Sequence, residues 1–354
     1  MDEEIRARRA ACTDTFLGNG LIRPRDLLAS IDPDTEPDLY GAGGVVTDLE
    51  RHVADVLGKP AAVFLPSGTM AQAATLRVHA DRRTTRTVVW HPYSHLEQHE
   101  GQAHQRLHHL VGRRAGDLER LLTLDDLEDV AEPVAALVLE LPQRDLGGAL
   151  PAWDDLVAQT RWARDRGAAV HLDGARLWEA SAGYDRAPAD IAALFDTVYV
   201  SFYKGIGALP GCCVAGSAPD IAAVREWRSR LGGTLFALWP AAASALRLLD
   251  DALAEMPARM RHARAIWDAL AGVPEVRVVP DPPQAPMMHL LFAASAETFR
   301  ENAQRLADET GLWVWPSGFA TGDPAVVRAE LSVGHATLRH KPEAIAEILA
   351  GLCA

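Results

Sequence analysis

Short apolar runs alternate with helical stretches through the middle of the chain. The runs that predict buried strands are residues 60–65, 87–90, 134–141, 168–172, 197–201 and 211–215. The stretches with helical periodicity are residues 70–80, 153–166 and 188–195. Because strands that alternate with helices pair in parallel and are covered on both faces, this pattern predicts an α/β domain with a mostly parallel sheet.

The pattern changes after about residue 241. A long helical stretch runs to about residue 270, and we expect Pro257 to interrupt it because proline lacks a backbone N–H. Further strands are predicted at residues 276–279, 287–292 and 312–315, with helices at residues 296–310 and from 342 onward. We therefore expect an N-terminal segment (residues 1–30) packing near the small domain, a large domain (residues 31–250) and a small C-terminal domain (residues 251–354).

Composition narrows the class of protein. Hydrophobic residues make up 48% of the 354 positions, which is enough for a large core. The formal net charge of -13 argues against a nucleic-acid partner. No apolar stretch is long enough to span a membrane, and the first residues lack the apolar core of a signal peptide. The four cysteines show neither zinc spacing nor a disulfide framework, which predicts a cytoplasmic location.

The turn Ser67-Gly68-Thr69 lies between a predicted strand and a predicted helix. Backbone N–H groups and hydroxyls at a helix N-terminus favour a phosphate group. A serine at this position is also a common N-cap, so a purely structural role is the alternative. The turn becomes more informative when it is taken together with two residues that follow later strands.

Those two residues are Asp173 and Lys204, each of which follows an apolar strand. An acid and a lysine placed in this way suit pyridoxal 5'-phosphate (PLP): the lysine forms a Schiff base, and the acid keeps the pyridine nitrogen protonated. Lysine occurs only three times in the chain, at Lys59, Lys204 and Lys341. The alternatives are a surface lysine at Lys204 and a helix cap at Asp173. Because Ser67, Asp173 and Lys204 all follow strand ends, we expect them at one edge of the sheet.

Several segments together carry a family resemblance. They are, in order, Tyr40-Gly41, Phe64-Leu65-Pro66-Ser67-Gly68-Thr69, His171-Leu172-Asp173-Gly174-Ala175-Arg176 and Lys204-Gly205-Ile206-Gly207. The chain resembles the threonine aldolase and β-eliminating lyase family of fold-type I PLP-dependent enzymes. The resemblance implies a large domain with a mostly parallel seven-stranded sheet, a small α+β C-terminal domain, and a homodimer or homotetramer.

The resemblance also implies roles for particular residues. Those expected at the cofactor are Ser67, Gly68, Thr69, His95, Asp173, Arg176, Ser201 and Lys204. Those expected at the substrate are Thr13, Gln143, Arg176 and Arg328, with the two arginines on its carboxylate. Gln143 stands about where a histidine near the substrate hydroxyl is typical. The alternatives are an ion pair between Arg176 and a core acid such as Glu140, a structural role for Arg328, and an ordinary loop histidine at His95.

The segment from His91 to His109 is rich in histidine. His91, His95 and His99 recur every four residues, so a helix would align them for a transition metal. Neither a cysteine nor a clear set of supporting acids accompanies them. We therefore predict no metal site, with His95 stacking on the cofactor ring.

The predicted reaction is cleavage of the Cα–Cβ bond of a small β-hydroxy-α-amino acid to glycine and an aldehyde, as in L-threonine aldolases. With Gln143 in place of a histidine, His95 or an ordered water must take the hydroxyl proton. The alternatives are β-elimination or transaldolase-type chemistry on another amino acid, and a PLP-binding subunit without turnover.

Overall fold

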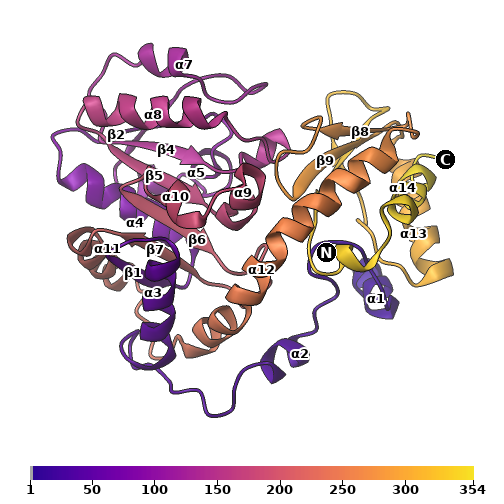
Figure 1. The fold of residues 1–354 in the computed structure, drawn as a ribbon, viewed down its shortest axis with the longest axis horizontal. Coiled ribbons are helices and arrows are strands. Elements are labelled where there is room, and N and C mark those ends of the chain that lie inside the picture. The colour runs from indigo at the N-terminus through magenta and orange to yellow at the C-terminus, as the bar shows by residue number, and fades with distance from the viewer. Residues whose placement is uncertain (1–2) are drawn as a thin grey trace. The chain divides into compact units, whose positions relative to one another are not determined.

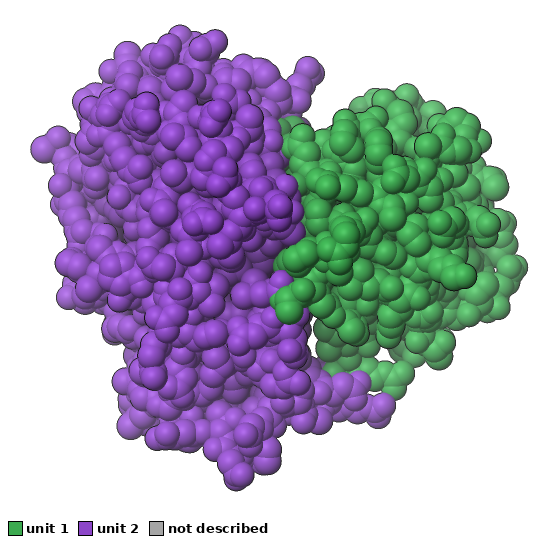
Figure 2. Space-filling model, viewed as in Figure 1, with its two compact units in different colours: residues 1–23, 146–149, 254–354 green, residues 24–145, 150–253 purple. Residues whose placement is uncertain are grey.

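The computed structural model describes residues 3–354 (Figure 1). The chain divides into two compact units, coloured separately in Figure 2. Unit 1 contains the residues up to Arg23, Leu146–Ala149 and Ala254–Ala354, and unit 2 contains Pro24–Asp145 and Leu150–Leu253. Each unit has its own sheet and its own apolar core.

Unit 2 is built on a seven-stranded sheet. Its strands are β1 (Ala61–Leu65), β2 (Thr87–Trp90), β3 (Val111–Arg114), β4 (Ala136–Glu140), β5 (Ala169–Gly174), β6 (Thr197–Ser201) and β7 (Cys212–Gly216). The spatial order is β1-β7-β6-β5-β4-β2-β3, and only β7 runs antiparallel to its neighbours. The predicted mostly parallel sheet is confirmed. Strand β3 was not predicted, because this edge strand consists of exposed residues and so lacks an apolar run.

Unit 2 also contains a series of shorter helices. They are α2 (Pro24–Ala29), α3 (Gly44–Val56), α4 (Gly68–Asp81), α5 (His95–Gln98), α6 (Ala103–Arg106), α7 (Leu124–Glu128), α8 (Trp153–Asp165), α9 (Leu177–Tyr184), α10 (Pro188–Ala192) and α11 (Ala218–Arg230). Helices α3, α4, α8, α9 and α11 pack against its strands (Figure 1). Every residue of β5 and β6 is buried, as a sheet covered on both faces requires.

The sheet topology brings several strand ends to one edge. Strands β2, β4, β5 and β6 are parallel, and β1 points the same way because β7 is antiparallel to both β1 and β6. The segments that follow Leu65, Glu140 and Ser201 therefore leave from the same edge as Asp173. Ligands of such sheets bind beyond the carboxyl ends of the strands, so this edge is the candidate site.

Unit 1 is built on a four-stranded antiparallel sheet in the order β10-β11-β9-β8. Its strands are β8 (Val276–Val279), β9 (Met287–Phe292), β10 (Phe319–Ala320) and β11 (Val327–Ser332), and its helices include α1 (Glu3–Ala11), α13 (Ala296–Thr310) and α14 (Pro342–Gly351). The start and the end of α13 are clear in the sequence: the Ser295 hydroxyl accepts from the Thr298 N–H at 3.1 Å, and Gly311 ends the helix at φ +70°.

Two predictions about the C-terminal third are wrong. Helix α12 (Trp239–Leu270) is continuous through Pro257, so proline does not interrupt it. Tertiary packing outweighs the local preference there, with the helix residues Met256 and Met260 both buried. Residues 312–315 form no strand; only a single bridge joins Leu312 to Asp14. Over residues 3–354, no helix combines the length and apolar character that a membrane crossing needs.

Candidate active site

Asp173 lies near the end of β5 and is 1% exposed. Its Oδ1 accepts a hydrogen bond from the Ala175 N–H at 3.2 Å. The carboxylate therefore closes the turn before α9 but is not the helix cap that was the alternative, because the N-cap of α9 is Arg176. The same carboxylate raises the pKa of the Lys204 amine, so it lies within electrostatic reach of the loop that follows β6.

Lys204 lies in the loop that follows β6. Burial lowers the pKa of its amine first, and the Arg176 guanidinium lowers it further, whereas Asp173, Glu140 and Glu179 raise it. These mutual influences show that the loop brings the amine into the same charged cluster as Asp173. The close approach depends on Gly205, because a Cβ there would collide with the Glu179 carboxylate. A lowered amine pKa favours the neutral form, which is the form that attacks a carbonyl carbon.

The turn Ser67-Gly68-Thr69 begins α4, as predicted from its position between strand and helix. The Ser67 hydroxyl accepts from the Met70 N–H at 3.5 Å, so Ser67 is the N-cap of α4. Gly68 is required by space, because a Cβ there would meet the hydroxyl of Tyr199. The turn presents the first N–H groups of α4 at the same sheet edge as Asp173, where an anion is favoured.

Ser201 ends β6 and is fully buried. Its hydroxyl donates to the Ala175 carbonyl at 2.9 Å. Because the Ala175 N–H already bonds Asp173, the serine ties β6 to the turn that holds the acid. Its predicted contact with a cofactor stays a prediction.

His95 begins the short helix α5 and is paired with a buried acid. Its Nδ1 lies 3.2 Å from Glu100 Oε1. The bond to Glu100 raises the pKa of His95; Asp173 raises it as well, and Lys204 lowers it. His95 therefore lies in the same electrostatic neighbourhood as the acid and the amine. Burial in turn raises the pKa of Glu100.

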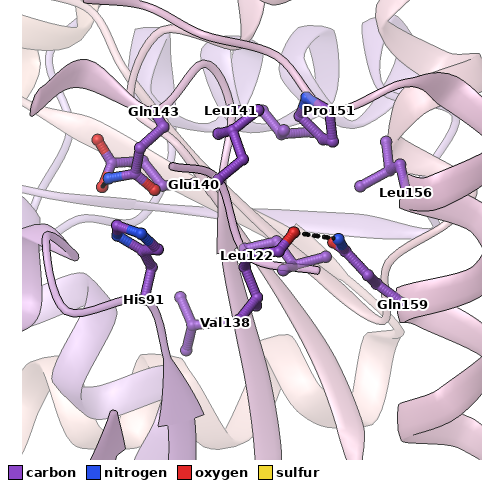
Figure 3. Close-up of a pocket in the computed structure, with 11 residues that line it drawn as sticks. His91, Leu122, Val138, Glu140, Leu141, Gln143, Pro151, Leu156 and Gln159 are labelled. Carbon is purple, nitrogen blue, oxygen red and sulfur yellow. Dashed lines mark hydrogen bonds between the residues drawn. The ribbon is translucent and has the colours of Figure 1, made fainter. Parts of the chain in front are cut away.

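Gln143 and Glu140 meet beside a small cavity (Figure 3). The Gln143 Nε2 donates to Glu140 Oε2 at 3.1 Å and to the Tyr93 carbonyl at 3.2 Å. The cavity has a volume of about 20 Å³, which suffices for one water molecule, and its lining includes His91. The side-chain amide nitrogen of Gln143 is thus used within the protein.

The two predicted arginines belong to different units. Arg176 precedes α9 in unit 2, and its effect on the Lys204 amine puts it in the cluster. Arg328 lies on β11 in unit 1, with its guanidinium over the Phe319 ring at 5.9 Å. Thr13 is also in unit 1, where its N–H donates to the Gly311 carbonyl at 3.0 Å. The substrate contacts of Arg328 and Thr13 stay predictions.

Two acids of the cluster were not predicted as site residues, although Glu140 was named as an alternative ion-pair partner of Arg176. Glu140 ends β4 directly beside Asp173 in the sheet register. Burial raises the pKa of Glu140 to about 7, and Asp173 adds to the rise. A polar residue at the end of an apolar strand is the signal that singled out Asp173, and the same signal would have found Glu140. Glu179 lies within α9, where no local pattern distinguishes it from a surface acid.

The histidines of residues 91–109 bond to separate partners. His91 Nε2 bonds the Arg120 carbonyl at 2.9 Å, whereas His95 bonds Glu100 and His99 bonds Asp145 at 3.4 Å. Within the described part of the chain, no three histidine, cysteine or acidic side chains gather as metal ligands would.

Known proteins resemble this chain in sequence and in fold. The structure superimposes on a candidate L-allo-threonine aldolase from Listeria monocytogenes EGD-E with a TM-score of 0.91 and 36% identity, over 98% of this chain and 97% of that one. A low-specificity L-threonine aldolase 1 from Arabidopsis thaliana is 25% identical over 302 residues, which is 82% of this chain and 84% of that protein.

A more distant likeness concerns the fold alone. A serine palmitoyltransferase from S. paucimobilis, solved with bound PLP, has a TM-score of 0.68 and 17% identity over 96% of this chain and 86% of that one. These likenesses confirm the predicted fold class. The family model of β-eliminating lyases matches residues 29–293. The chain is therefore an enzyme of the lyase class and belongs to the β-eliminating lyase family that includes the threonine aldolases.

Proposed function

We propose that this protein is a PLP-dependent lyase that cleaves the Cα–Cβ bond of a small β-hydroxy-α-amino acid to give glycine and an aldehyde. The observation that carries the proposal is the charged cluster at the carboxyl edge of the sheet, in which buried Asp173 and half-buried Arg176 both act on the half-buried Lys204 amine. The family and the named aldolase relatives support the same reaction.

The residues at this edge fit PLP. Lys204 would hold the cofactor aldehyde, Asp173 the pyridine nitrogen, and the turn Ser67-Gly68-Thr69 the phosphate. The Gly68 turn has the exposed helix N-terminus that a phosphate needs, and the lowered pKa of Lys204 suits Schiff-base chemistry. When bound, PLP supplies an electron-accepting ring for the bond broken at Cα.

The chain's own residues would orient the substrate and move its protons. Arg176 would bind the substrate carboxylate, with Arg328 as the proposed second arginine. A bidentate guanidinium fixes the orientation of the carboxylate and so selects which bond at Cα breaks. His95, held by Glu100, offers an imidazole beside Lys204 and Asp173 for stacking or proton transfer.

The second candidate reaction is β-elimination, which the family name includes. It needs the same cofactor and the same carboxylate contact but releases ammonia and a keto acid. Transaldol exchange on the same residues is a further variant. A non-catalytic PLP-binding subunit is disfavoured by the full set of Lys204, Asp173 and Arg176. We also propose a homodimer or homotetramer and a cytoplasmic location.

One substrate panel distinguishes these reactions. Purified protein reconstituted with PLP is incubated with L-threonine, L-allo-threonine and phenylserine, and then with serine and cysteine. The proposal expects aldehyde and glycine from at least one of the first three. Pyruvate from serine or cysteine, without aldehyde from the others, would replace it with β-elimination. A protein that shows no visible absorbance after reconstitution would end the PLP assignment itself.

A further inference from the structure

The cleavage reaction needs a group that takes the proton from the substrate hydroxyl, and Gln143 does not meet this need. Its Nε2 is bonded to Glu140 and to the Tyr93 carbonyl, and the side chain is only 3% exposed. A carboxamide is moreover no base, because it has no site that accepts a proton near neutral pH. His95 is the base expected from the sequence, but its Nδ1 is already paired with Glu100 and its ring is expected to stack on the cofactor, so a neighbouring imidazole is the alternative base.

His99 is one helical turn beyond His95 and lies against it. The two rings are 5.1 Å apart between centroids and tilted by 53°. This contact follows from their spacing, because residues four apart share a face of a helix. Asp173 raises the pKa of His95 and Lys204 lowers it, so His95 lies near the charged cluster. His99 is therefore joined to that cluster through the ring of His95.

Asp145 holds the His99 ring from a different segment. It lies two residues beyond Gln143, and its Oδ2 is 3.4 Å from His99 Nε2. Arg144 Nη1 contacts the other Asp145 oxygen at 3.4 Å. A carboxylate at Nε2 favours the tautomer that carries its proton there, which leaves Nδ1 with the lone pair of a base.

The imidazoles of His95 and His99 differ in their exposure and in the acid that holds each of them. The His95 side chain is 35% exposed and shares its Nδ1 with the buried Glu100. The His99 side chain is 43% exposed and is held by an acid that is itself partly open to solvent. His95 is therefore the inner ring, whose pKa responds to the charges of the cluster, and His99 is the outer and more exposed ring.

We propose that His99 is the catalytic residue that takes the proton of the substrate β-hydroxyl, and that Asp145 is its positioning residue. The inference rests on the proposed function. In this step the hydroxyl O–H bond breaks and an N–H bond forms at His99 Nδ1. The former O–H electron pair becomes the second bond of the aldehyde carbonyl. The Cα–Cβ electron pair stays with Cα, which later takes a proton and leaves as glycine.

The first test compares two reactions of the same PLP-loaded protein. Cleavage of the best β-hydroxy amino acid needs a base for the hydroxyl, whereas exchange of the Cα hydrogen of glycine in D2O does not. For His99→Ala we expect kcat for cleavage to fall by about 100-fold, the size of a general-base contribution, with little change in KM. The rate of glycine exchange should stay within about twofold of the wild type, because glycine has no hydroxyl that needs this base.

Added imidazole provides a second readout. Because the His99 side chain is partly exposed, free imidazole can enter the space left in His99→Ala and accept the proton. We expect imidazole to restore a substantial part of the lost cleavage rate. His109→Asn, an exposed histidine of the same segment, is the matched control.

Asp145 is tested as a positioning residue. Asp145→Asn should lower kcat for cleavage by about tenfold, less than loss of the base itself, and Asp145→Glu should recover part of it. Urea unfolding of each variant without cofactor should match the wild type within about 0.5 kcal/mol, as for other surface changes. A loss of stability together with equal losses in both reactions would mean a structural role.

The outcomes separate this inference from the function on which it rests. If the wild type exchanges glycine but cleaves no β-hydroxy amino acid, the proposed function fails. If the wild type cleaves and His99→Ala cleaves equally well, His99 is not the base and the inference is overturned. If His99→Ala loses cleavage and glycine exchange alike and imidazole restores neither, the inference is overturned as well.

Discussion

Two polar clusters lie two residues apart on the same buried strand, and they are organised in opposite ways. His171, in the middle of β5, bonds Thr197 Oγ1 at 2.8 Å and Gln72 Oε1 at 2.6 Å. His79 completes this cluster through a 2.8 Å bond to the same threonine. Burial lowers the pKa of both histidines to about 3, so this cluster is neutral near pH 7.

The second cluster begins at Asp173 and consists of charged groups. Arg176 and Glu140 both act on the Lys204 amine, Lys204 acts on Glu140 in return, and burial shifts the pKa of the lysine and of Glu140 toward their neutral forms. The difference separates a closed structural cluster from the cluster that we propose to be functional. A structural cluster is closed by neutral hydrogen bonds, whereas a functional one keeps opposing charges at a strand end, where a ligand can reach them.

The largest effect on the charged cluster should come from removing the Lys204 amine. Lys204→Ala should abolish the visible absorbance of the PLP-loaded protein and lower cleavage by about 10³-fold, because no other amine of the cluster can form the Schiff base. Lys59→Met is the control: its Nζ donates to the Phe195 carbonyl, so that variant should lose stability and keep its absorbance. An absorbance band retained in Lys204→Ala would contradict the assignment of the lysine.

The neutral cluster should respond in the opposite way. His171→Leu leaves buried Gln72 and Thr197 without the ring nitrogens, so we expect the free energy of unfolding to fall by about 2–4 kcal/mol. Absorbance and KM of the folded variant should stay near the wild type, as measured by urea unfolding and by steady-state kinetics. A stable variant with a lost absorbance band would instead place His171 in the function.

Glu140 tests whether the charged cluster costs stability. Its ordinary pKa of 4.5 rises to about 7 on folding, chiefly through burial. Between these values the folded protein keeps a proton that the unfolded chain releases, so stability falls as pH rises from about 4.5 to about 7.

Glu140→Gln removes this dependence. The variant should be more stable than the wild type by on the order of 1–3 kcal/mol at pH 8, and nearly equal to it at pH 4.5. Urea unfolding at both pH values measures the difference. Equal destabilisation at both pH values would show that Glu140 acts through its hydrogen bonds alone.

The smallest expected effect concerns His95. Because the bond to Glu100 raises the pKa of His95, Glu100→Gln should lower that pKa. If neutral His95 is needed for activity, the acidic limb of the kcat/KM profile moves to lower pH. Exposed Glu128, replaced by glutamine, serves as the control. An unmoved limb would exclude His95 from the steps that this profile reports.

Most strands of the large sheet and one turn of the candidate site could be predicted from the sequence, because the signals for them are local. The apolar runs that became β1, β2, β4, β5, β6 and β7, and the turn at Ser67, depend on neighbours in the chain. Strand β3 was missed and residues 312–315 were wrongly predicted as a strand, because a short segment at an edge is decided by the strand that it pairs with.

What the sequence determined by itself was the fold class and the placement of Asp173 and Lys204 at the ends of strands that share one sheet edge. Only the tertiary structure decided which other side chains join them. Glu140 comes from the neighbouring strand, Glu179 from a helix, and Asp145 reaches His99 across 46 positions of chain. Such contacts depend on strand register and on the course of loops. A sequence specifies these only through packing of the whole unit, so they appear in no local pattern.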